Sequence, residues 1–100
     1  MQISIGPEGH AVLLDADDFT SLSVRSALDP PGLDDALRRG GLGRMADDGH
    51  AALEVAALRD LRGAERPDGW DESYASMIDF ARSRGWVDQA GAVRAHLERA

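Results

Sequence analysis

Residues 68–86, DGWDESYASMIDFARSRGW, carry the clearest fold signal in the chain. Asp71 and Glu72 suit the positive end of a helix dipole, and Asp68 before them is a good N-cap. The apolar side chains that follow recur at helical spacing and form one broad stripe: Trp70, Tyr74, Met77, Ile78 and Ala81. We therefore expect a helix that begins just after Asp68 and buries one face in the core.

Gly85 and Trp86 indicate how this helix ends. A glycine just after the last helical turn adopts left-handed backbone at little cost. The apolar residue after it, Trp86, can then fold back onto Phe80 or Ala81. We therefore expect a positive φ at Gly85 and a sharp change of chain direction.

The last stretch, 88–100, predicts a second helix. Asp88 is its candidate N-cap, and its inner face would contain Val93 and Leu97. Because the link between the two helices is so short, we expect them to form a C-terminal αα-hairpin.

The N-terminal quarter of the chain has the features of β-strands. Residues 2–5 and 20–25 alternate apolar with polar side chains, and residues 11–14 are a short apolar run. Segments rich in Gly, Pro and Asp separate the three stretches and favour turns. We therefore expect an N-terminal antiparallel β-meander, one face of which needs a cover.

The middle of the chain is expected to supply part of that cover. Asp29, with two prolines after it, is typical of a helix start. Residues 42–62 have two interpretations: a second hairpin followed by a short helix that ends before Gly63, or one helix over 51–62. We favour the hairpin, because Asp48-Gly49 is a strong turn signal.

These expectations combine into one α+β domain spanning residues 1–100. Its parts are an antiparallel meander covered by helices, a second hairpin in one of the two interpretations, and an αα-hairpin at the C-terminus. A chain of 100 residues with 43% hydrophobic and 29% charged side chains fits a single folded domain.

Charge and composition narrow the function classes. The net charge is −7 and the arginines are dispersed, so nucleic acid and anionic membrane surfaces are disfavoured as partners. The absence of cysteine excludes disulfides, thiolate nucleophiles and Cys-based metal sites. The absence of cysteine, together with the lack of a membrane-span or signal-peptide pattern, predicts a cytoplasmic protein.

Candidate catalytic residues are few. His10 and His50 lie beside expected turns, where a neighbouring carboxylate such as Asp15 could orient a histidine as a general base. The acidic run Asp15, Asp17 and Asp18 lacks the glycine and glutamate of a calcium loop, and the histidines lack metal-ligand spacing. We therefore expect no metal and no cofactor.

The aromatic residues suggest an interaction role. Trp70, Tyr74 and Trp86 lie within the expected αα-hairpin, and their type is frequent both in cores and at interfaces. We expect a small non-catalytic accessory or protein-interaction domain, which forms a homo-oligomer or binds a protein partner. The alternative is a small acid/base enzyme or small-molecule-binding protein. A packed core beneath the helices favours the first interpretation; a cavity lined by Trp or Tyr, with a His and an Asp pointing into it, favours the second.

Overall fold

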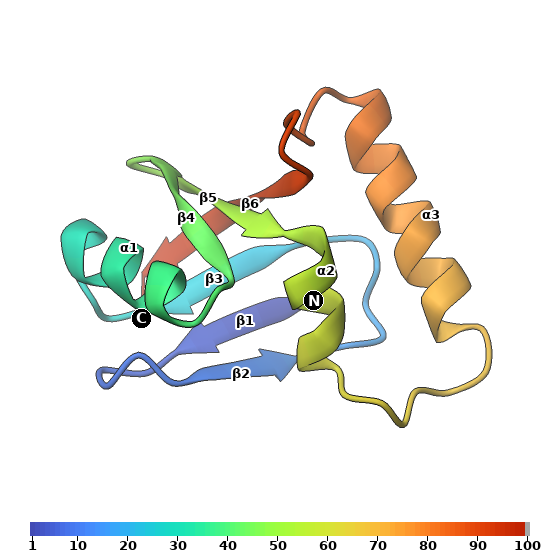
Figure 1. Ribbon diagram of the computed structural model, residues 1–100, viewed down its shortest axis with the longest axis horizontal. Coiled ribbons are helices and arrows are strands. Elements are labelled where there is room, and N and C mark those ends of the chain that lie inside the picture. Colours follow the sequence, from blue (N-terminus) through green and yellow to red (C-terminus); the bar gives the residue numbers. More distant parts are fainter. Residues whose placement is uncertain (100) are drawn as a thin grey trace.

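The computed structural model describes residues 1–99, which form one six-stranded sheet and three helices (Figure 1). The elements in chain order are β1 (Gln2–Ile5), β2 (Ala11–Leu14), β3 (Ser23–Ser26), α1 (Pro30–Arg39), β4 (Gly43–Asp47), β5 (His50–Glu54), α2 (Val55–Leu61), α3 (Trp70–Ser83) and β6 (Ala92–Arg99). The strand order is β2-β1-β3-β6-β5-β4. The sheet is mixed, because β3 runs parallel to both β1 and β6 while the other neighbours are antiparallel.

The predicted antiparallel meander is wrong. The first two strands do form an antiparallel hairpin, but β3 pairs with β1, in parallel, instead of with β2. The connection 15–22 passes the N-terminal end of β1. There the Met1 ammonium donates hydrogen bonds to the carbonyls of Asp18 (2.8 Å) and Ser21 (3.0 Å). Period-two alternation indicates which side chains face the core, but it does not indicate which strand is the neighbour.

The predicted αα-hairpin is also wrong, because the last element is the strand β6 and not a helix. In β6 the side chains of Val93 and Ala95 are buried, whereas those of Arg94 and His96 are exposed. This strand lies between β3 and β5, so its main chain is hydrogen-bonded on both sides. Pairing on both edges overrides the helix propensity of its alanines.

Asp88, the expected cap of that helix, instead closes a turn. Its carboxylate accepts hydrogen bonds from the main-chain N–H groups of Ala90 (2.9 Å) and Ala92 (3.0 Å). This turn returns the chain to the sheet, and Val87 forms an isolated antiparallel bridge with Val93.

Several local expectations are confirmed. The Asp29 carboxylate caps α1 by accepting a hydrogen bond from Gly32 N–H (2.8 Å). Residues 42–62 form the hairpin of β4 and β5 followed by the short helix α2. Gly85 has a φ of +78°.

The predicted N-cap of α3 is wrong by one residue. Gly69 occupies that position, with a φ of +84° and no side-chain cap. The left-handed glycine separates Asp68 from the helix, which begins at Trp70 after a turn closed by the hydrogen bond from Trp70 N–H to Pro67 O (3.0 Å).

One face of the sheet packs against the helices, and apolar side chains from the strands and from all three helices form one buried cluster there. Figure 1 shows α3 beside the end of the sheet at which β1, β3 and β6 begin. The core includes strand residues such as Ile3, Val24 and Val93. The helices contribute Leu33 and Leu37 from α1, Leu58 from α2, and Trp70, Tyr74 and Ile78 from α3.

Candidate functional site

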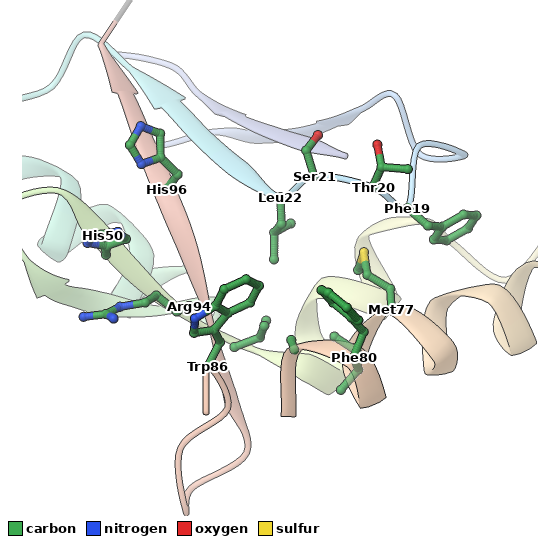
Figure 2. Close-up of a pocket in the computed structure, with 13 residues that line it drawn as sticks. Phe19, Thr20, Ser21, Leu22, His50, Met77, Phe80, Trp86, Arg94 and His96 are labelled. Carbon is green, nitrogen blue, oxygen red and sulfur yellow. The ribbon is translucent and has the colours of Figure 1, made fainter. Parts of the chain in front are cut away.

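A pocket of about 290 Å³ lies where the end of α3 meets the sheet (Figure 2). Its walls come from four parts of the chain: residues 19–22 before β3, the second half of α3, Trp86 after that helix, and residues of β5 and β6. From the two strands these are the outward-facing His50, Arg94 and His96 and the buried Val93. Figure 2 shows Met77, Phe80 and Trp86 on one side and the histidines His50 and His96 on the other. The pocket therefore has an apolar end and a polar end.

The apolar end depends on the way α3 terminates. Trp86 N–H donates to Ala81 O (2.9 Å) and Gly85 N–H donates to Arg82 O (3.1 Å), which is the Schellman pattern of hydrogen bonds. This turn brings the Trp86 ring edge-on to that of Phe80, with ring centroids 6.1 Å apart. The expected fold-back of Trp86 onto Phe80 is therefore confirmed, but the pair is on the surface: Phe80 is 54% exposed and Trp86 45% exposed.

The polar end follows from the pairing of β5 with β6. His50 and His96 are direct partners in this antiparallel pair, so their side chains share the face of the sheet that the helices leave open. Their rings lie edge to face with centroids 5.8 Å apart. Arg94 emerges from the same face, two residues before His96 in β6.

Asp47 organises this polar end from the last position of β4. Its carboxylate accepts hydrogen bonds from His50 Nδ1 (2.9 Å), Gly49 N–H (2.9 Å) and Arg94 Nη2 (3.0 Å). The hydrogen bond from His50, and next that from Gly49, lowers the pKa of Asp47 to about 2. The carboxylate is therefore ionised at neutral pH and can only accept, so Nδ1 of His50 carries the proton and Nε2 is left for other partners.

The predicted catalytic candidates are not brought together. His10 and Asp15 flank opposite ends of β2, whereas His50 lies in β5, with β1, β3 and β6 between these strands in the sheet. The carboxylate beside His50 is Asp47, which the sequence analysis did not select. The signal was available, because Asp47 and His50 flank the Asp48-Gly49 turn and such positions face each other in a tight hairpin.

Arg94 and His96 were missed for a different reason. The helix expected over 88–100 concealed their alternation with Val93, Ala95 and Leu97.

The three predicted interaction residues have different surroundings. Trp70 and Tyr74 are each only 3% exposed and their rings stack at 5.1 Å, so they belong to the core. The indole N–H of Trp70 donates to Ala16 O (2.9 Å), and the Tyr74 hydroxyl donates to Val55 O (2.6 Å). Trp86 is the member of the set that lies at the surface.

The two outer strands of the sheet form a second candidate feature. In β2, Val12 and Leu14 point away from the core and are 47% and 43% exposed. In β4, a bulge between Met45 and Asp47 interrupts the pairing with β5, and Arg44 forms an ion pair with Asp88 (3.2 Å). One edge is thus regular and apolar, and the other is irregular and charged.

Within residues 1–99, no three histidine or acidic side chains are grouped closely enough to hold a metal ion. None of the helices in this part of the chain has the length and apolar character needed to cross a membrane. Comparison with protein-family models, curated proteins and solved structures found no match to this chain.

Proposed function

We propose that this chain is a small non-catalytic interaction domain that self-associates through the outer edge of β2. The observation that carries the proposal is the exposed apolar pair Val12 and Leu14 on an edge strand that no strand within residues 1–99 covers. Unprotected edges of this kind pair readily with another strand, and natural monomers usually blunt them with charges, prolines or bulges.

The main-chain groups needed for pairing face outward. Gly6 N–H donates to His10 O (3.0 Å), so the even-numbered residues of β2 direct their main-chain groups toward β1. The N–H and C=O groups of Ala11 and Leu13 therefore face the free edge.

Two copies of β2 can pair antiparallel in a two-fold symmetric dimer that uses these outward-facing main-chain groups. In an antiparallel pair, directly opposed residues share a face of the sheet. Centring the pair on Leu13 lets each copy of Leu13 donate to and accept from the other. The same register sets Val12 opposite Leu14 of the second copy, so the exposed apolar side chains of both copies cover one another.

The non-catalytic part of the proposal rests on the two hydroxyls that line the pocket. Thr20 and Ser21 line the pocket, and both donate to the carboxylate of Asp18, at 2.6 and 3.4 Å. A nucleophile needs an adjacent base. The base beside these hydroxyls is a weak one, because the hydrogen bonds from Thr20 lower the pKa of Asp18. A cytoplasmic location belongs to the same proposal, since a chain without cysteine suits a reducing compartment.

Sedimentation equilibrium tests the association. An edge of four residues is shorter than a typical stable interface, so we expect a weak dimer that becomes populated in the high-micromolar range. Since each copy carries a net charge of −7, added salt should screen the repulsion and strengthen the dimer.

Lysine variants locate the interface. Val12→Lys with Leu14→Lys should weaken the dimer at least about tenfold, by removing the apolar cover and placing like charges opposite each other. Ala46→Lys, on the exposed surface of the other edge strand, is the matched control and should dimerise like the parent. A parent protein that stays monomeric throughout this range, or a double lysine variant that still dimerises, would contradict the proposal.

A further inference from the structure

The pocket between α3 and the sheet has the composition of a binding site for a small amphipathic acid. We infer that it binds a small organic carboxylate that carries a flat apolar or aromatic group. This function is separate from self-association, because the pocket and β2 share no residues.

The apolar end provides flat contact surfaces that are already exposed. Phe80 and Trp86 stand edge to face, and Met77 and Leu22 line the space beside them. Small-molecule sites are typically concave and mostly apolar, with a few polar groups at one place. A volume of about 290 Å³ is at the lower end for such sites and suits a ligand with one ring better than a peptide.

The polar end favours a negatively charged group. Arg94 donates to Asp47 through Nη2, and within residues 1–99 no other side chain accepts from its guanidinium. A guanidinium has several N–H donors in one plane, so Arg94 can bind a carboxylate while it keeps Asp47. His50 and His96 add ring nitrogens on the same face.

Asp47 does not direct a free oxygen at such a ligand, because both of its carboxylate oxygens already accept hydrogen bonds. Its two oxygens accept from His50, Gly49 and Arg94, and Asp47 itself is absent from the pocket wall. The carboxylate thus acts as a support that holds His50 and Arg94 in place. In a chain with a net charge of −7, this pairing keeps a guanidinium beside an apolar cavity.

The two tryptophans make the site testable by nuclear magnetic resonance. We propose a titration of the ¹⁵N-labelled protein with 3-phenylpropionate, and in parallel with the neutral amide 3-phenylpropionamide. The indole N–H signal of Trp86 should shift with the acid, whereas that of Trp70, which is buried and bonded to Ala16 O, should not. A Trp86→Phe variant assigns the two signals.

Substitutions separate the charge from the apolar contact. Arg94→Gln should weaken binding of the acid at least about fivefold and leave binding of the amide unchanged. Phe80→Ala should weaken both ligands. Arg82→Gln, on the exposed surface of α3 and away from the pocket wall, is the matched control and should bind like the parent.

Three results would overturn the inference. They are no shift of the Trp86 signal at millimolar acid, equal affinity for acid and amide, or equal loss of acid binding in Arg94→Gln and Arg82→Gln. Amide spectra that retain the dispersion of the parent show that each variant is folded. Because these variants leave β2 intact, failure here does not affect the self-association test.

Discussion

The two ends of α3 contain similar aromatic pairs in opposite surroundings. At the first turns, Trp70 and Tyr74 are stacked and buried, each 3% exposed. At the last turn and just beyond it, Phe80 and Trp86 stand edge to face and are 54% and 45% exposed. The residue types are nearly the same, so the difference comes from what lies beneath each end of the helix.

The buried end is covered by segments distant in the sequence. Phe19 lies against Trp70 at 5.8 Å, and the hydrogen bonds of Trp70 to Ala16 O and of Tyr74 to Val55 O satisfy their polar atoms inside the core. Burial raises the pKa of the Tyr74 phenol, which therefore stays protonated as a donor. The exposed end projects beside the open face of the sheet, where Trp86 forms a pocket wall. An aromatic pair is thus core or surface according to its tertiary neighbours.

The largest effect is expected at the buried end. Trp70→Ala removes a buried indole and leaves Ala16 O without its donor, so we expect a loss of about 3–5 kcal/mol in the free energy of unfolding. Such a loss is a large share of the stability of a domain this size. Urea unfolding followed by circular dichroism measures it. An unchanged midpoint would mean that Trp70 is not part of the core.

A smaller loss of stability is expected when only the hydroxyl of Tyr74 is removed at the same end of the helix. Tyr74→Phe keeps the ring and removes the hydroxyl that donates to Val55 O (2.6 Å). We expect a loss of about 1–2 kcal/mol, because a partly buried carbonyl loses one partner while the packing stays the same. The same urea experiment applies, with Tyr74→Leu as the companion that also removes the ring. If Tyr74→Phe matched the parent, the hydrogen bond would contribute nothing to stability.

The smallest effect is expected at the exposed end. Trp86→Ala removes a half-exposed ring that lies edge to face with the exposed ring of Phe80, so we expect a change below about 1 kcal/mol in the free energy of unfolding. A loss as large as that of Trp70→Ala would remove the distinction between the two ends. It would also argue against a preformed surface at the pocket, since Trp86 would then be a core residue.

The expectations that held depend on neighbouring residues. Asp29 with its two prolines, the Asp48-Gly49 turn and Gly85 are each specified within a few positions, because caps and turns are closed by local main-chain bonds. The helical stripe of α3 belongs to the same group, although the cap at Gly69 shifted its start by one residue.

The expectations that failed depend on strands far apart in the sequence. Whether β3 joins β1 or β2, and whether residues 92–99 form a helix or a strand, depends on which main-chain edges are available in the assembled sheet. The alternation of Val93, Arg94, Ala95 and His96 is visible in the sequence, but alanine also favours helices, and no local bond decides between the two.

The candidate site also combines contacts between residues close in the chain with contacts that depend on strand pairing. The Asp47–His50 contact spans one tight turn, and the fold-back of Trp86 onto Phe80 follows from the turn at Gly85. Both contacts join residues that are close in the chain, so the sequence by itself determined them. Only the tertiary structure placed these two features around one pocket, because β6 inserts between β3 and β5 and brings Arg94 and His96 beside His50. The physical reason is the sequence separation of the interacting residues. Caps and turns are closed by bonds within a few residues, whereas the partner of a strand is chosen among distant segments by how well the whole sheet buries its apolar face.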